Sequence, residues 1–295
     1  MLRRGRALRV IIDKSYPYLL IAPAMVFLIA ALFYPLIASL NVSFYSYSPM
    51  KIEFIGLENY RRIFSDPTFW DSLWVTSIFA AIVVVGELLL GLLLASILNR
   101  ELRAGNLLRS LIMLPLVLTP VAVGLMFRFM YNPDYGIFNY FLSVVGLPPL
   151  LWAADTQTAL LSVALVDIWQ ITPYPTILFL AGLKTIPREQ YEAAEIDGAS
   201  RFSKFVHVTL PWLTPMIVLF LIIRTSDAFQ IFDLVFTITG GGPGNASRSL
   251  SMYAFITGWS GLEFGYASAV SYVIVAICMG FAVAYVRVFT RKVEV

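Results

Sequence analysis

Apolar residues fill six long runs of this chain, and shorter polar segments separate them. The runs cover roughly residues 17–42, 70–98, 107–131, 159–183, 212–238 and 266–289. A helix needs about 20 mostly apolar residues to cross the hydrocarbon core of a bilayer, and every run exceeds that length. The pattern therefore predicts an all-α membrane protein with six transmembrane helices.

Composition supports this class. Hydrophobic residues make up 59% of the 295 residues and charged residues only 13%, whereas soluble domains carry about 25% charged residues. The first run follows a basic segment, as in a signal peptide, but it is too long and lacks a clean small-residue cleavage site. We therefore interpret residues 1–16 as a basic N-terminal segment and 17–295 as the transmembrane domain.

Lysine and arginine are distributed unevenly over the loops. Five lie in or beside the loops after the first, third and fifth runs, and fifteen lie in or beside the other loops and the two termini. The fifteen are Arg3, Arg4, Arg6, Arg9, Lys14, Arg100, Arg103, Arg109, Lys184, Arg188, Arg201, Lys204, Arg287, Arg291 and Lys292. Because cytoplasmic loops carry the excess of Lys and Arg, we expect both termini and the 184–211 loop in the cytoplasm. The basic residues form no stripe, so the net charge of +3 does not indicate nucleic-acid binding.

Reactive side chains are scarce. Cys278 and His207 are the single cysteine and histidine, which leaves almost no material for a His/Cys metal site or a Cys–His nucleophile. The glycine run at 240–244 is followed by Asn245 where a phosphate-binding loop needs lysine. We therefore expect no catalytic residue, no metal site and no bound nucleotide, and we interpret the glycine run as a tight outer turn.

The loop between the fourth and fifth runs has a distinctive order of residues. Residues 189–215 read EQYEAAEIDGASRFSKFVHVTLPWLTP. The segment 188–197 is rich in helix formers, Pro187 lies near its start, and Gly198 suits the left-handed conformation that ends a helix. We expect a second short helix at about 200–209 that presents Phe202, Phe205 and Val206. A solvated amphipathic loop is the alternative interpretation.

The order EAA, DGA, LP and P in this segment resembles the EAA loop of permease subunits of bacterial ABC importers, in the sugar-importing branch. FIGLENYRRIF at 54–64 and RTSDAFQIFDLVFTITGGGPG at 224–244 are similar to other segments of that branch. The resemblance covers the chain from about residue 18. It implies a type I importer permease in the bacterial inner membrane whose 189–211 loop fits a cleft on an ATPase. The coupling positions that it carries over are Glu192, Ala193, Ala194, Asp197 and Gly198.

The resemblance also implies partners. They are a second homologous permease in a heterodimer, two copies of an ABC ATPase, an extracytoplasmic solute-binding protein and the lipid bilayer. ATP and Mg would be bound by the ATPase, so the chain itself is expected to bind no cofactor and to be no enzyme. The solute implied is a carbohydrate or polyol, with disaccharides, monosaccharides, glycerol and glycerol phosphate all open.

Several polar side chains lie inside the apolar runs, where they are costly and tend to face a bundle interior or a water-filled path. One helix face would carry Asp167, Gln170 and Tyr174, and another series recurs every three residues at Arg224, Asp227, Gln230 and Asp233. In a structural interpretation, Arg224 pairs with Asp227 or Glu87. In a functional one, carboxylates and amides accept and donate hydrogen bonds to solute hydroxyls, with Trp169 or Tyr174 as an apolar ring face. The candidate pathway residues are Asp167, Gln170, Tyr174, Asp227, Gln230 and Asp233.

Two other classes of function remain as alternatives. A proton-coupled secondary transporter would use Glu87, Asp167 and Asp233 as a relay and need no ATPase. An intramembrane enzyme is disfavoured, because the sequence holds no nucleophile–base motif.

Overall fold

The computed structural model describes residues 18, 20–49, 51–100 and 105–290. The predicted basic segment 1–16 lies outside the described residues, as do Arg103, Arg291 and Lys292. The described chain is mostly helical and divides into two compact units. One contains the residues up to Arg62 together with Thr257–Tyr272, and the other contains Ile63–Ile256 and the residues from Val273 onward.

The smaller unit contains the first described helix, a β-hairpin and the start of α15 (Phe264–Thr290). A helix over Leu20–Ser43 contains the π-helical turn η1 (Ile29–Phe33) and α2 (Tyr34–Ser43). Strands β1 (Tyr45–Ser48) and β2 (Lys51–Phe54) follow and pair antiparallel, with Tyr45 opposite Phe54. The buried Asn59 donates to the carbonyls of Ser43 (2.8 Å) and Tyr45 (2.9 Å), which ties the hairpin to the end of α2. This hairpin departs from the all-α prediction. Its strands alternate polar residues with aromatic or aliphatic ones, a period of two that suits a strand.

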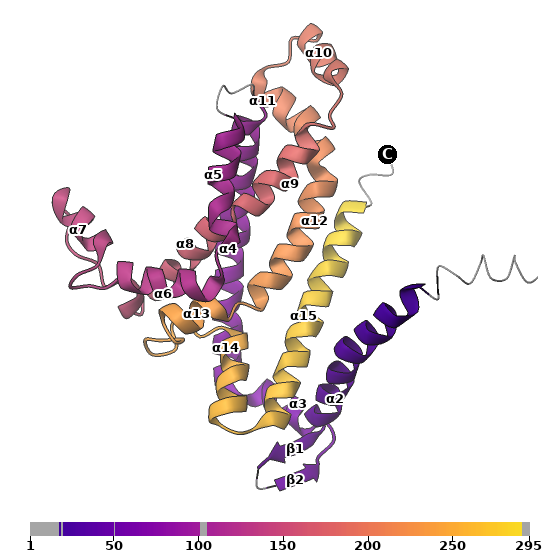
Figure 1. Cartoon of the computed structure of the whole chain (residues 1–295), viewed down its shortest axis with the longest axis vertical. Coiled ribbons are helices and arrows are strands. Elements are labelled where there is room, and N and C mark those ends of the chain that lie inside the picture. Colours follow the sequence, from indigo (N-terminus) through magenta and orange to yellow (C-terminus); the bar gives the residue numbers. More distant parts are fainter. Residues whose placement is uncertain (1–17, 19, 50, 101–104, 291–295) are drawn as a thin grey trace, which may run out of the picture. The chain divides into compact units, whose positions relative to one another are not determined.

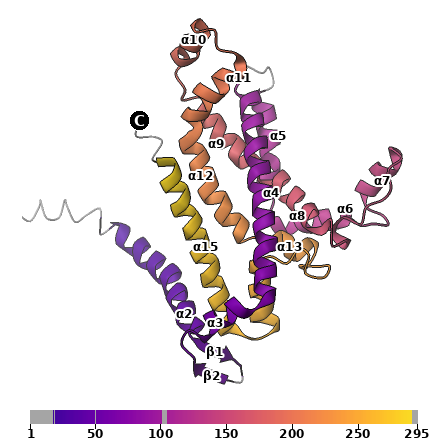
Figure 2. The ribbon, with the colours of Figure 1, turned by 180° about the vertical axis from the view of Figure 1, so that it is seen from behind.

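Four helices form the packed part of the larger unit. The longest is α4 (Pro67–Leu98), whose first turn is capped by the Asp66 carboxylate, which accepts from the Thr68 N–H (2.9 Å). Against it pack α8 (Ala159–Ile171), α9 (Pro173–Leu183) and α12 (Leu210–Phe229) (Figures 1 and 2). Gly91 lets α9 approach α4 closely, because a Cβ there would lie 2.8 Å from Cβ of Pro175.

Helices long and apolar enough to span a bilayer cover four of the predicted runs, at Leu20–Ser43, Pro67–Leu98, Arg201–Ile238 and Phe264–Phe289. The other two runs are broken. Helices α5 (Gly105–Val117) and α6 (Pro120–Met130) meet at 92°, and α8 and α9 meet at 42°. Pro120 and Pro173 each begin a second half, where the missing N–H ends the preceding hydrogen-bond ladder. Within the described residues the count is therefore four candidate spans, or up to six if each bent pair counts as one.

The fifth run is also interrupted. Helix α12 ends at Phe229, residues 230–232 are not helical, and α13 (Asp233–Ile238) begins afresh. The expectation of one helix from Arg224 to Asp233 is therefore wrong. Helix α13 packs on α6 where Gly124 leaves room for Thr237, since a Cβ on Gly124 would lie 1.8 Å from the Thr237 hydroxyl oxygen.

The remaining described elements include several short helices and the long last helix, α15. They are α3 (Glu58–Ser65), α7 (Ile137–Val144), η2 (Trp152–Ala154), α14 (Leu250–Phe255), η4 (Ile256–Ser260) and α15 (Phe264–Thr290). The loop between α9 and α12 contains α10 (Arg188–Ile196), α11 (Arg201–Lys204) and the π-helical turn η3 (Phe205–Thr209).

Candidate functional site

A buried ion cluster joins α4, α8 and α12. The guanidinium of Arg224 donates from Nε to Glu87 Oε2 (2.6 Å) and from Nη2 to Glu87 Oε1 (2.9 Å). The same Nη2 also donates to Asp167 Oδ2. All three side chains are buried. The predicted pairing of Arg224 with Glu87 is thus found. The second salt bridge of Arg224 is to Asp167 and not, as the alternative prediction had it, to Asp227.

A polar cleft of about 350 Å³ opens beside this cluster. Its deep wall contains the buried Asp167, Gln170 and Arg224, and its rim contains the exposed Asp227, Gln230 and Asp233. The interruption at 230–232 shapes the rim, because it lets the last turn of α12 and the first residue of α13 both reach the cleft. The remaining lining residues are Pro120, Ile171, Ile231, Phe232 and Leu234.

The cleft brings together five of the six candidate pathway residues. Tyr174 is the exception. Its ring is half-buried and lies 6.4 Å from the ring of Phe220, and it is not part of the cleft lining. Gln170 has a structural bond as well, since its Nε2 donates to the carbonyl of Leu118 (2.9 Å) in the break between α5 and α6. A polar side chain thereby satisfies a carbonyl that the helix break leaves free.

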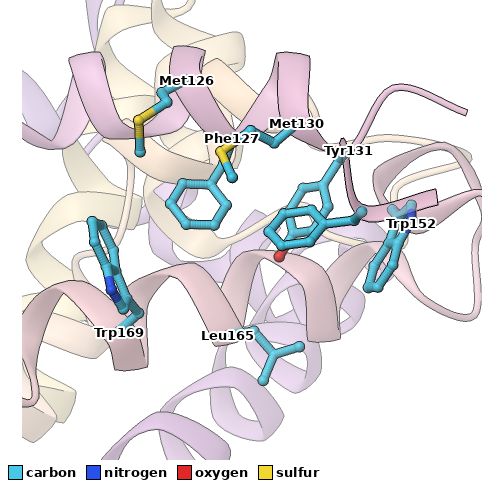
Figure 3. Close-up of a pocket in the computed structure, with 8 residues that line it drawn as sticks. Met126, Phe127, Met130, Tyr131, Trp152, Leu165 and Trp169 are labelled. Carbon is cyan, nitrogen blue, oxygen red and sulfur yellow. The ribbon is translucent and has the colours of Figure 1, made fainter. Parts of the chain in front are cut away.

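Trp169 faces a different space. It lines an apolar cavity of about 530 Å³ between α6 and α8, together with Phe127, Tyr131 and Trp152 (Figure 3). The rings of Tyr131 and Trp152 are stacked at 5.1 Å, and the Tyr131 hydroxyl donates to the carbonyl of Ser162 (3.1 Å). Trp169 is therefore placed in an aromatic cluster and does not provide a ring face for the polar cleft.

The loop between α9 and α12 has a well-defined turn at Gly198. Gly198 has φ of +74°, and its N–H donates to the carbonyl of Glu195 (3.0 Å) while the Ala199 N–H donates to that of Ala194 (2.9 Å). These two bonds form a Schellman motif, which ends α10. The predicted helix end at Gly198 is therefore confirmed.

The second half of this loop is helical, as predicted, but it does not stop at residue 209. Ser200 caps α11 by accepting from the Ser203 N–H (3.2 Å), and α11, η3 and α12 follow one another without a gap. Lys204 Nζ donates to Glu195 Oε1 (2.6 Å), and this hydrogen bond and charge lower the pKa of the Glu195 carboxyl. The ion pair between the two short helices therefore persists until the pH falls below the ordinary range of a glutamate.

Most carried-over coupling positions are accessible. Glu192, Ala193, Asp197 and Gly198 are exposed and Ala194 is half-buried. Two large apolar side chains stand out beside them, Ile196 at 88% and Phe202 at 76% exposure. Phe202 was expected at this surface, whereas Ile196 was missed, although its place two residues before Gly198 on a short polar helix could have revealed it.

The glycine run 240–244 follows helix α13 rather than a strand, so it lacks the context of a phosphate-binding loop. Among the described residues, no group of three or more His, Cys, Asp or Glu side chains is arranged to hold a metal ion. The chemistry that the described cleft lining offers is hydrogen bonding and charge.

Comparison with known proteins decides the family. Residues 87–294 match the family described as the binding-protein-dependent transport system inner membrane component. The chain belongs to this family. Membership confirms the resemblance to importer permeases, and it makes the protein a transport component of the inner membrane rather than an enzyme.

Relatives of this inner-membrane component match over nearly their full length. The trehalose/maltose transport system permease protein MalF of Thermococcus litoralis is 37% identical, over 94% of each chain. The sulfoquinovosyl glycerol transport system permease protein SmoG of Agrobacterium fabrum is also 37% identical, over 95% of this chain and 92% of its own. A solved bacterial ABC transporter involved in the import of the acidic polysaccharide alginate has the same fold, with a TM-score of 0.84, 20% identity, and 97% and 99% coverage. The predicted helical importer fold is confirmed; the six-span count and the orientation stay predictions.

Proposed function

We propose that this inner-membrane component is one of two permease subunits of an ABC importer for a carbohydrate or polyol. Its partners in the proposal are a second, homologous permease, two copies of an ATPase and an extracytoplasmic binding protein that delivers the solute. The ATPase binds ATP and Mg, and this chain binds neither. The names of the relatives MalF and SmoG support the carbohydrate class.

The observation that carries the proposal is a single helical path from the exposed loop to the cleft. It runs from Arg201, beside the turn at Gly198, through η3 and α12 to Phe229. The last turn of α12 carries Asp227 to the cleft rim, and Arg224 on the same helix forms part of the deep wall. A push on the loop by an ATPase is therefore delivered along covalent backbone to the residues proposed to contact solute.

A proton-coupled secondary transporter is less well supported. Its relay would need Glu87 and Asp167 to exchange protons, yet both carboxylates are held by Arg224 in the described chain. Family membership also favours a system that works with a binding protein.

The loop can be tested through its turn. A Gly198→Val substitution forces a β-branched residue to adopt φ of +74°, at a cost of about 1–2 kcal/mol. No neighbouring atom lies within 4 Å of a Cβ built there, so the effect acts through the backbone alone. With the complete transporter in proteoliposomes, we expect Gly198→Val to reduce ATP-driven uptake of radiolabelled maltose or glycerol phosphate at least tenfold. Gly198→Asn is the matched control and should retain most uptake, because asparagine adopts left-handed conformations readily.

Two results would contradict the proposal. One is full uptake by the Gly198→Val complex with normal stimulation of its ATPase by the binding protein. The other is uptake by this chain without any ATPase, driven by a pH gradient.

A further inference from the structure

The described lining of the cleft has one cationic side chain, and that side chain already donates hydrogen bonds to two carboxylates. Among the described lining residues, Arg224 is the only cation. It is buried, and it donates from Nε and Nη2 to Glu87 and from Nη2 to Asp167. One guanidinium thus faces two carboxylates, so the cluster has no surplus positive charge to offer a solute.

The rim adds further negative charge. Asp227 and Asp233 are exposed, and neither forms a salt bridge in the described part of the chain. Between them Gln230 donates from Nε2 to the carbonyl of Ser226 (3.1 Å). The lining therefore contains three carboxylates against one guanidinium, a formal charge of −2 before Glu87 is counted behind it.

This balance bears on the solute, because the relatives' printed names span uncharged and anionic solutes. Trehalose and maltose are uncharged, whereas a sulfoquinovosyl group carries a sulfonate and alginate is acidic. Like charges repel strongly where little water screens them, so a negatively charged lining disfavours the binding of an anionic solute. Carboxylates that are free of cations accept hydrogen bonds from hydroxyl groups.

We propose that the cleft admits uncharged polyhydroxylated solutes and excludes anionic ones. The carboxylates of Asp227 and Asp233, which form no salt bridge in the described part of the chain, lie there beside an Arg224 whose charge is already balanced. This inference rests on the proposed function and narrows it to uncharged carbohydrates or polyols. Sulfonated, phosphorylated and uronate sugars fall outside the class.

The charge of the cleft can be measured without knowing the solute. Cys278 is the single cysteine of the chain, so Cys278→Ser removes cysteine from this subunit, and its labelling is read on this subunit after the subunits are separated. Gln230→Cys then places a thiol at the cleft rim, and Leu147→Cys places a reference thiol on an exposed residue outside the cleft lining. The complete transporter is treated with a trimethylammonium and a sulfonate methanethiosulfonate reagent, and the two reaction rates are compared at each site.

We expect the ratio of cationic to anionic rates to be at least tenfold higher at Gln230→Cys than at Leu147→Cys. The ratio should fall toward the reference value when Asp227→Asn and Asp233→Asn are added. An equal ratio at both sites, or a preference of the rim thiol for the sulfonate reagent, would overturn the inference.

Uptake separates this failure from failure of the proposed function. With native chains in proteoliposomes, ATP-driven uptake of maltose but not of glycerol phosphate supports both proposals. Uptake of glycerol phosphate at a rate equal to that of an uncharged sugar overturns the charge selection and leaves the importer intact. Absence of ATP-driven uptake for every carbohydrate and polyol tried overturns the proposed function, and the solute class with it.

Discussion

At the scale of single residues, the ion cluster shows that the cost of removing a buried charge depends on how many opposite charges are left behind. Arg224 satisfies two carboxylates, Glu87 and Asp167, and all three side chains are removed from water. A buried pair contributes little net stability, but loss of one partner leaves an uncompensated charge at high cost. Because the cluster contains two anions and one cation, loss of the cation is expected to destabilise the protein more than loss of one anion.

This inequality predicts that two neutralising substitutions destabilise the protein to different extents. Arg224→Met leaves two carboxylates buried together and should destabilise the protein by about 3–5 kcal/mol. Glu87→Gln leaves Arg224 with Asp167 as a balanced pair and should cost less than about 1.5 kcal/mol. Thermal unfolding of the detergent-solubilised protein measures both changes. Equal destabilisation by the two substitutions would show that the charge balance does not control the site.

Sequence reasoning found the members of this cluster but not all of its pairings. Charges inside apolar runs identified Glu87, Asp167 and Arg224, and spacing along the helix suggested Asp227 as a local partner. The choice between Asp227 and Asp167 depends on which helix packs against α12, and a pattern within one run contains no such information.

At the scale of helices, the positions of proline and glycine predict where helices end, but they do not predict the angles between consecutive helices. Gly198 ends α10 as expected, but nothing in the sequence gives the 92° angle between α5 and α6. The interruption at 230–232 was missed because residues 224–239 contain neither glycine nor proline. Packing of α13 on α6 accompanies that break, and the contact depends on the absence of a side chain at Gly124.

A single methyl group tests this contact. Gly124→Ala would place a carbon 1.8 Å from the Thr237 hydroxyl oxygen, so α6 and α13 must separate, at a cost of about 1–3 kcal/mol. Gly280→Ala on α15 is the matched control, since no neighbouring atom lies within 4 Å of its built Cβ, and alanine there should be neutral or slightly stabilising. Unfolding temperatures of the two variants give the comparison. A Gly124→Ala protein as stable as Gly280→Ala would argue against close packing at this crossing.

At the scale of the whole molecule, the distribution of Lys and Arg predicts the orientation in the membrane. The 184–211 loop is expected in the cytoplasm, and the 131–159 segment on the opposite side. Fold and family follow from run lengths and the EAA order, because those features are local. Orientation follows only from charge statistics, so it needs a direct test.

Cysteine accessibility provides that test in the Cys278→Ser background. Ile196→Cys should react with a membrane-impermeant thiol reagent only after the membrane is permeabilised, since its loop is predicted to lie in the cytoplasm. Leu147→Cys should react in intact spheroplasts. Both residues are exposed, so their chemical reactivity is otherwise comparable. The reverse labelling pattern would place the loop on the wrong side for the proposed coupling.

The uninterrupted helix from Arg201 to Phe229 has a further mechanical consequence. At about 1.5 Å per residue, its 29 residues measure roughly 43 Å. A lever of that length pivoting near its middle by about 10° would carry each end roughly 4 Å in opposite directions. A displacement of a few ångströms at the Gly198 turn would then widen or narrow the cleft at Asp227 by a similar amount, without any change inside the helix itself.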